Sequence, residues 1–367
     1  MRNLFDFATK ELSQDAFLMW LFENYDCENR FVRQCAYGLL NEFSGLDMKD
    51  GEIESLLTYS QYPCKPCKSE VKGQKRGKMD VLIRFEYKGE VYLTVIEDKT
   101  FSSQHDNQLR RYDDTLYHAD TIKAFGVTKE HISRIFYKTD IEEELDKRAC
   151  SEADWKAYFL EDIYDLLNRI FPDGSDTGSD ILNDYIAYVA SQRKKTLELP
   201  DTPMNEWKRI SLRTFFYLKI LGESTDTRIN RESLIDSKYY YYNEFTLRYY
   251  IPGTSYRICL GVITREGSDR ASVSCYISSF PHQEDPLNKT DEKRCPTKTE
   301  QAVIKTFLEK CDGFSKINSK GAKNYLHFGN IKKNAKVLRY DNGPEKLAAS
   351  IREIMTKFLD VCSEISL

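Results

Sequence analysis

The sequence predicts an α/β fold in which a central β-sheet is flanked by helices, followed by an α+β C-terminal domain. Two helices are predicted over residues 3–25 and 28–43, where apolar side chains recur at helical spacing. Two strands with alternating apolar residues follow, 79–87 and 91–100. The short turn between these strands predicts an antiparallel hairpin.

Length and composition indicate a soluble globular protein. The chain has 367 residues, enough for two domains, with 41% hydrophobic and 31% charged residues. A net charge of −4 argues against a surface covered in basic charge but leaves a local basic cleft open. No apolar run has the length of a membrane span, and Asp6 and Glu11 interrupt the region where a signal peptide would be apolar. We expect a cytoplasmic protein without membrane contact.

Ten cysteines are scattered along the chain, and we expect most of them to be reduced thiols. Cys64 and Cys67 form a CxxC motif. A structural zinc site usually needs a second such pair or nearby histidines, and neither partner is evident. We therefore favour a loop with two thiols over a zinc or iron–sulfur site.

The second strand of the hairpin, Val91–Thr100, ends in three consecutive charges, Glu97, Asp98 and Lys99. Alternation along a strand places Glu97 and Lys99 on one face and Asp98 on the other. Counting back from a turn near Gly89 places Asp80 opposite Asp98 or one residue to either side. Carboxylates that close together repel each other unless a proton or a cation lies between them. Hard oxygen ligands of this kind suit Mg²⁺ or Mn²⁺.

A third helix is predicted from about Asn107, with Asp106 as its N-terminal cap. Gln108 and Tyr112 are four residues apart on it and share one face, and Arg111 joins the same side. By themselves these residues are typical of an ordinary polar helix face. Their position directly after the charged strand end gives them more weight.

Glu11 lies at the margin of the apolar stripe predicted for the first helix. That stripe consists of Leu4, Ala8, Leu12, Ala16, Met19 and Trp20. A carboxylate at such a margin is usually solvated, and periodicity alone favours that interpretation.

Six basic residues and one Glu occupy Lys65–Lys78. One interpretation is a solvated loop or strand edge, where lysines also discourage aggregation. The other is a lip that contacts phosphates beside a cleft. The segment alone supports both equally.

The remaining elements complete the sheet and form a second domain. Further strands are predicted at 122–127 and 134–138, with helices at 155–171 and 181–193. Pro200 and Pro203 lie in a predicted linker, so we expect domains over residues 1–198 and 205–367. The second domain is predicted to contain helices at 206–221 and 346–363 and strands at 239–251, 255–264 and 271–279. The tyrosine-rich run at 239–250 favours a half-exposed strand face over a surface on which the bases of single-stranded nucleic acid stack.

The pattern of Asp80 followed by Glu97-Asp98-Lys99 resembles the signature of the PD-(D/E)XK nuclease superfamily. Gln108-xxx-Tyr112 resembles the QxxxY motif of members related to lambda exonuclease and RecB-type nuclease domains. Residues 3–22 are similar to the first helix of a bacterial subfamily in which a Glu joins the metal site, and Glu11 is the matching residue. The resemblance extends to about residue 195. Here Met79 precedes Asp80 where the motif name has Pro, but that position varies and has no chemical role.

The resemblance implies a restriction-endonuclease-like core with a mixed sheet and Mg²⁺- or Mn²⁺-dependent phosphodiester hydrolysis. Metal ligands would be Asp80, Glu97, the backbone carbonyl of Asp98, and Glu11. Lys99 would act on the attacking water, and Gln108 and Tyr112 would hydrogen-bond the phosphate or the water. The residues expected to contact the nucleic acid are Arg111, Lys72, Lys75, Arg76 and Lys78.

DNA is the expected substrate, with endonuclease action in restriction or phage defence as the expected role. The C-terminal domain would serve nucleic-acid recognition or assembly, as a homodimer or with a protein partner. The alternative is a catalytically inactive nucleic-acid-binding or protein-interaction subunit that keeps the nuclease fold.

Overall fold

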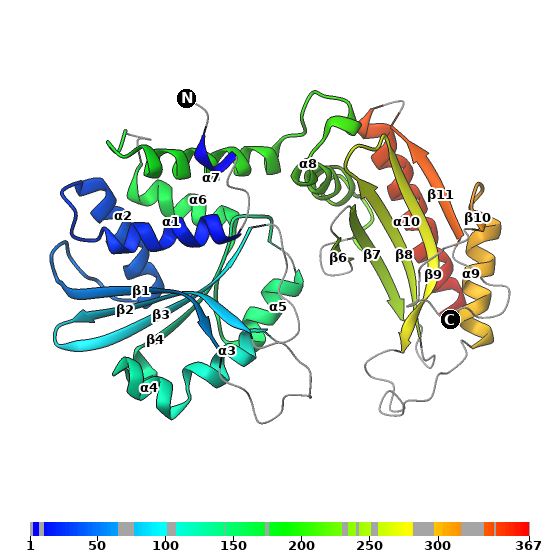
Figure 1. Ribbon diagram of the computed structural model, residues 1–367. Coiled ribbons are helices and arrows are strands. Elements are labelled where there is room, and N and C mark those ends of the chain that lie inside the picture. The colour runs from blue at the N-terminus through cyan, green and yellow to red at the C-terminus, as the bar shows by residue number, and fades with distance from the viewer. Residues whose placement is uncertain are drawn as a thin grey trace. The chain divides into compact units, whose positions relative to one another are not determined.

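A computed structural model of the chain divides into two compact units, residues 1–194 and 195–367 (Figure 1). The residues that it describes are 3–6, 11–64, 77–100, 108–142, 144–172, 176–229, 234–239, 242–250, 256–281, 297–316, 334–340 and 343–366.

The first unit is built on a mixed five-stranded sheet with the order β1-β2-β3-β4-β5. Its strands are β1 (Ile53–Pro63), β2 (Lys78–Tyr87), β3 (Glu90–Lys99), β4 (Ile132–Lys138) and β5 (Lys156–Tyr158). The pairs β1–β2 and β2–β3 are antiparallel, whereas β3–β4 and β4–β5 are parallel.

A two-residue turn joins β2 to β3 and confirms the predicted hairpin. Lys88 and Gly89 both have positive φ, 53° and 74°, the conformation of the tight turn that matches the twist of paired strands. Tyr87 pairs with Glu90, and the ladder runs back to Val81 opposite Ile96. The next step along this register aligns Asp80 with Glu97.

Helices cover both faces of the sheet (Figure 1). One layer contains α1 (Glu11–Glu23), α2 (Arg30–Ser44), α6 (Leu160–Ile170) and α7 (Asp180–Leu197); the other contains α3 (Gln108–Leu116), α4 (Ala119–Phe125) and α5 (Glu144–Ala153). Side chains alternate along β3 between the two cores: Ile96 packs into the first layer, and Leu93 and Val95 pack into the second.

The apolar stripe predicted for the first helix is wrong. α1 begins only at Glu11, after a short 3-10 turn at Leu4–Asp6. Leu12 is 62% exposed, whereas Gln14 and Asp15 are buried together with the apolar side chains Phe17, Leu18, Leu21 and Phe22. The buried face of α1 therefore carries two polar residues at its N-terminal end, and these break the apolar periodicity.

Two other predicted elements of the first unit differ from the structure. Residues 122–127, predicted as a strand, belong mostly to α4, because His118 caps its N-terminus and Gly126 ends it with φ 66°. The helix predicted at 155–171 is the short strand β5 followed by α6. The helix at 28–43 and the strand at 134–138 are confirmed as α2 and β4.

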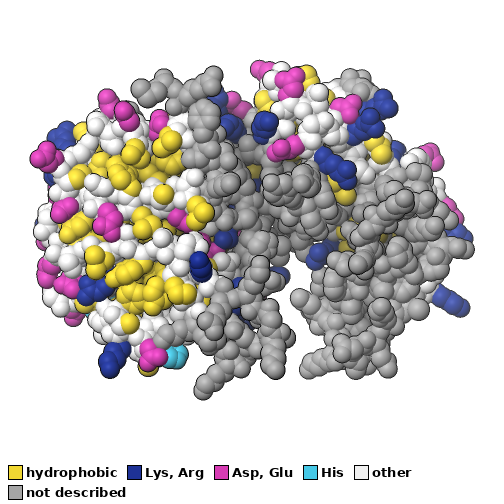
Figure 2. All heavy atoms as spheres, in the orientation of Figure 1, with side chains coloured by type: hydrophobic (Ala, Val, Ile, Leu, Met, Phe, Trp, Pro, Cys, Tyr) yellow, Lys and Arg dark blue, Asp and Glu magenta, His cyan; other side chains and the backbone are white. Residues whose placement is uncertain are grey.

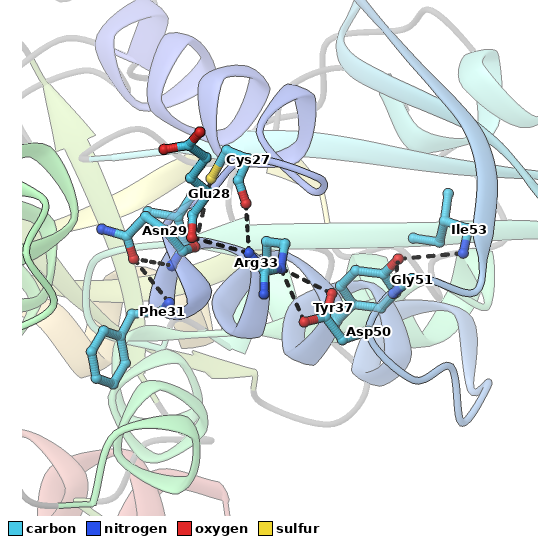
Figure 3. Close-up of polar contacts among 10 residues, drawn as sticks. Cys27, Glu28, Asn29, Phe31, Arg33, Tyr37, Asp50, Gly51 and Ile53 are labelled. Atoms are coloured by element: carbon cyan, nitrogen blue, oxygen red, sulfur yellow. Dashed lines mark hydrogen bonds and ion pairs between the residues drawn. The ribbon is translucent and has the colours of Figure 1, made fainter.

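Side chains of α2 hold the start of β1 in place (Figure 3). Asn29 caps the helix by accepting a hydrogen bond from the Phe31 backbone N–H at 2.9 Å. The Tyr37 hydroxyl accepts from the backbone N–H groups of Gly51 and Ile53, at 3.0 and 3.3 Å. These bonds satisfy backbone donors in the connection from helix to strand and so fix the outer edge of the sheet.

The second unit contains a six-stranded antiparallel sheet with the order β10-β11-β9-β8-β7-β6. Its strands are β6 (Leu234–Tyr239), β7 (Tyr242–Tyr250), β8 (Tyr256–Arg265), β9 (Arg270–Pro281), β10 (Ser315–Lys316) and β11 (Asn334–Arg339). The helices are α8 (Arg209–Thr214), the π-helical η4 (Phe215–Gly222), α9 (Lys298–Lys310) and α10 (Pro344–Ser366), after a 3-10 turn at Met204–Glu206. Phe216 stacks on Phe245 with ring centroids 3.6 Å apart, which joins the helices to the sheet.

The strand predicted at 239–251 is confirmed as β7, whereas β6 was not predicted. The single helix predicted at 206–221 is α8 continued by η4. Helix α9 was not predicted either, although Thr297 and Glu300 form a capping box at its start.

The described surface mixes charges of both signs. On the face shown in Figure 2, Lys and Arg side chains are interspersed with Asp and Glu, and hydrophobic side chains gather between them. Within the described part of the chain, no helix has the length and apolar character needed to cross a membrane.

Candidate active site

The ends of β2 and β3 bring Asp80, Glu97 and Lys99 together. The ammonium group of Lys99 forms an ion pair with Glu97 Oε1, and both side chains are buried. The backbone N–H of Asp98 donates to Asp80 Oδ2 at 3.1 Å, and Gln61 Nε2 donates to Asp80 Oδ1 at 3.1 Å. Asp80 is thereby fixed from both neighbouring strands, with its carboxylate directed to the charged end of β3.

The charge balance of this cluster leaves room for a cation. Burial raises the pKa of Glu97 to about 8; Lys99 opposes this shift, and the charge of Asp80 adds to it. The second carboxylate oxygen of Glu97, Oε2, is buried and has no hydrogen-bond partner among the described residues. Two carboxylates with an unsatisfied buried oxygen fit a hard divalent cation.

Such a cation would need further oxygen ligands. Within the described ranges, no group of three or more His, Cys, Asp or Glu side chains is arranged to hold a metal. Backbone carbonyls and water are the other ligands that Mg²⁺ commonly takes. The carbonyl of Asp98 lies on the same side as Lys99, whose Nζ donates to it at 3.3 Å. The side chain of Glu11, at the first residue of α1, lies outside the described part.

Helix α3 adds a pair of neutral hydrogen-bonding groups. Gln108 Nε2 donates to the Tyr112 hydroxyl at 2.6 Å, and that hydroxyl donates to the backbone carbonyl of Lys78. Tyr112 is fully buried, and its pKa is raised by burial and by the nearby charges of Glu97 and Asp80. The pair predicted from the i, i+4 spacing is therefore formed, and it ties α3 to the strand that carries Asp80.

The predicted nucleic-acid contacts are only partly described. Arg111 is half-buried on α3, and its Nε is buried without a hydrogen-bond partner among the described residues. Lys78 begins β2 with an exposed side chain. The remaining basic candidates, Lys72, Lys75 and Arg76, lie outside the described residues.

Cys64 is buried beside this site. Burial raises the pKa of its thiol to about 11, although a hydrogen bond with Thr115 and the charge of Arg111 act in the opposite direction. A thiol with that pKa stays protonated at neutral pH and is a poor nucleophile. Cys67, the other half of the CxxC motif, lies outside the described residues.

The sequence analysis missed a set of buried polar residues around the strand ends. On the α1 side, Gln14 Nε2 donates to Asp98 Oδ1, and Thr139 Oγ1 donates to Gln14 Oε1 at 2.7 Å. Burial raises the pKa of Asp98 well above its ordinary value, and the neighbouring charges of Asp15 and Asp80 add to the shift. Asp98 therefore faces α1, opposite to Glu97 and Lys99, as strand alternation predicts.

A second buried ion pair lies at the end of the neighbouring strand. In the register of the parallel strands, Lys138 of β4 lies opposite Lys99 of β3. The ammonium group of Lys138 forms the ion pair with Asp146 of α5. Both side chains are almost completely inaccessible. The signal in the sequence was a charge at the end of an apolar strand, the same feature that identifies Lys99.

A family model described as the PD-(D/E)XK nuclease superfamily matches residues 2–195. Searches among curated proteins and among solved structures found no match. The mixed sheet flanked by helices is consistent with the restriction-endonuclease-like core that this superfamily shares, as the sequence predicted. Because the match covers more than half of the 367 residues and includes Asp80, Glu97 and Lys99, the chain belongs to the PD-(D/E)XK nuclease superfamily.

Proposed function

We propose that the protein is an active metal-dependent nuclease that hydrolyses phosphodiester bonds in DNA. The observation that carries the proposal is the alignment of Asp80 with Glu97, with Lys99 paired to Glu97 at the end of the same strand. A structural role would rarely place three ionisable side chains at two strand ends, one of them with an unsatisfied buried oxygen.

In this proposal, Asp80, Glu97 and the backbone carbonyl of Asp98 hold Mg²⁺ or Mn²⁺, and Glu11 completes the shell directly or through water. The bound cation would lower the pKa of a coordinated water and neutralise charge on the scissile phosphate. The unpartnered Glu97 Oε2 and the fixed carboxylate of Asp80 support this assignment.

Lys99 is the proposed catalytic cation. Its ammonium group orients the attacking water and stabilises the charge that develops on the phosphorane-like transition state. Gln108 and Tyr112 offer hydrogen bonds to the phosphate or the water, in keeping with the QxxxY motif and the bacterial subfamily that the sequence resembles. The bond from Gln108 to Tyr112 orients the two side chains for that task.

Contacts to flanking phosphates are assigned to Arg111, Lys78 and the three basic residues Lys72, Lys75 and Arg76. A half-buried guanidinium whose Nε has no described partner would gain from an anion. The net charge of −4 supports local phosphate contacts over a continuous basic surface.

The biological setting follows from the resemblance. We place the protein in the cytoplasm as an endonuclease in restriction or phage defence. The second unit would recognise nucleic acid or assemble the protein, as a homodimer or with a protein partner.

The alternative is a catalytically inactive binding subunit, and the ion pair of Lys99 with Glu97 disfavours it. The test incubates purified protein with Mg²⁺ or Mn²⁺ and with linear DNA, closed circular DNA, single-stranded DNA or RNA. Glu97→Ala and Lys99→Ala variants of unchanged fold serve as controls. If the wild type cleaves closed circular DNA only with metal, and both variants fail to cleave it, the protein is an endonuclease. No cleavage of any substrate, or equal cleavage by the variants, contradicts the proposal.

A further inference from the structure

Gln14 occupies an unusual position on α1. It is a neutral polar side chain, 2% exposed, on the buried face of α1, beside the buried carboxyl of Asp15 and the apolar core residues of that helix. Both ends of its amide are used: Nε2 donates to Asp98 Oδ1, and Oε1 accepts from Thr139 Oγ1. A buried amide is retained in a core only at the cost of its desolvation, so two satisfied bonds indicate a specific task.

The two partners of Gln14 lie near the ends of neighbouring strands. Asp98 is the residue before the last of β3, and Thr139 directly follows β4. The backbone N–H of Thr139 donates to the Lys99 carbonyl at 3.1 Å. One side chain from α1 therefore spans the ends of both parallel strands. The neighbouring carboxyl of Asp15, also on α1, contacts the Asp98 carboxyl as well.

From Asp98, the chain of contacts continues to the metal-binding carboxylates. The Asp98 backbone N–H donates to Asp80 Oδ2, and its carbonyl is the further ligand proposed for the cation. Glu97 and Lys99 flank Asp98 in the same strand. The N–H and the carbonyl belong to the two peptide groups on either side of the Asp98 Cα, so a displacement of Asp98 would affect both the Asp80 bond and the carbonyl.

We infer that Gln14 is a positioning residue of the active site, which holds the Asp98 side chain and so fixes the position of Asp98 and, through it, the geometry of the metal ligands. The inference rests on the proposed metal-dependent function. Gln14 touches neither the reacting atoms nor the cation in this assignment. Its effect passes through Asp98, as outer residues orient metal ligands in other proteins.

The test compares Gln14→Met with the wild type. Methionine has a similar length and removes both hydrogen bonds without adding charge. Gln192→Met is the matched control, because Gln192 is also a buried helical glutamine of the first unit, 6% exposed on α7. For each protein we would measure the Mn²⁺ dissociation constant by calorimetry without nucleic acid, the thermal midpoint, and kcat and KM for DNA cleavage.

For Gln14→Met we expect a rise in the Mn²⁺ dissociation constant of about tenfold or more, and a fall in kcat at saturating metal with KM for DNA unchanged. Gln192→Met removes an amide whose Oε1 has no hydrogen-bond partner among the described residues, and it should leave the metal constant and kcat unchanged. An unchanged metal constant and kcat in folded Gln14→Met would overturn the inference. So would equal defects in the two variants, because they would show a purely structural role.

A rescue experiment keeps the inference testable if Gln14→Met does not fold. In Gln14→Glu the donor to Asp98 is lost but the acceptor for Thr139 remains. Adding Asp98→Asn returns an N–H donor to that contact with the direction of the bond reversed. Recovery of Mn²⁺ affinity in the double variant, relative to Gln14→Glu, supports positioning, and no recovery contradicts it. If the wild type binds Mn²⁺ but cleaves nothing, the proposed function fails while the calorimetry still decides the role of Gln14.

Discussion

Asp80 and Asp98 are joined by a hydrogen bond from the backbone of one to the side chain of the other, 3.1 Å from the Asp98 nitrogen to Asp80 Oδ2. The bond crosses from β3 to β2 at the point where Glu97 lines up with Asp80. The backbone of β3 therefore holds the carboxylate that β2 contributes to the site. Changes to either strand end should affect both proposed metal ligands.

Asp80→Asn should reduce cleavage more than Gln108→Ala does. Asparagine keeps the shape of Asp80 but removes its charge, so the proposed cation loses an anionic ligand. Gln108→Ala removes only a neutral group that bonds to Tyr112. Rates at matched Mn²⁺ concentration give the ranking, and a larger defect in Gln108→Ala would show that the roles of β2 and α3 are interchanged.

Lys99→Met should abolish cleavage while Mn²⁺ binding is retained. The ammonium group is assigned to the water and the transition state and not to the cation, so its removal leaves the carboxylates in place. Calorimetry and the cleavage assay on the same sample separate the two effects. Lys78→Met is a suitable control, because its exposed side chain is assigned to phosphate binding and not to chemistry. Residual activity in Lys99→Met close to that of the wild type would refute the assignment.

Metal binding should become tighter as the pH rises towards 8. The pKa of Glu97 is raised to about 8 in the metal-free fold, mainly by burial. Below that pH the carboxyl keeps its proton, and binding a cation must release it. The Mn²⁺ dissociation constant should fall by up to about tenfold per pH unit between pH 6 and 8. Calorimetry in buffers of different ionisation enthalpy would also count the released protons, and a flat profile would mean that Glu97 is already ionised.

The same shift gives the sign of the pH dependence of stability. Between the ordinary pKa of 4.5 and about 8, the folded metal-free protein binds a proton at Glu97 that the unfolded chain has lost. The free energy of unfolding should therefore decrease with rising pH in that window, by at most about 1.4 kcal/mol per unit from this group. Urea unfolding with chelator present measures it, and Glu97→Gln should show a shallower slope.

Asp146→Asn should destabilise the first unit by about 3 kcal/mol. Asp146 contacts Lys138 where both side chains are almost inaccessible, so the change leaves a buried ammonium without its carboxylate. Glu152→Gln, on the same helix, breaks an exposed pair with Arg110 at 3.5 Å and should change stability by less than about 0.5 kcal/mol. Denaturant midpoints measure both, and equal values would show that Lys138 is compensated elsewhere.

The sequence predicted the parts of the site that depend on local order. The hairpin, the approach of Asp80 to the end of β3 and the Gln108–Tyr112 pair all follow from spacings of a few residues and one tight turn. The charged end of β3 also stood out, because a strand core rarely carries three charges.

The contribution of α1 could not be predicted in the same way. Gln14 and Asp15 look like surface residues in a periodic pattern, and only the folded sheet shows that they meet Asp98, 84 residues from Gln14. The error at 122–127 has a local cause: the apolar residues there fit a strand or a short helix equally well, and the caps His118 and Gly126 decide for the helix.

The tight turn between β2 and β3 has a consequence for how the protein folds. A two-residue loop closes quickly, and the hairpin can bring Asp80 to Glu97 without help from distant segments. The contact of Gln14 with Asp98 closes a far longer loop and so costs more chain entropy. We therefore expect the carboxylate pair to assemble early in folding, and α1 to dock on it later.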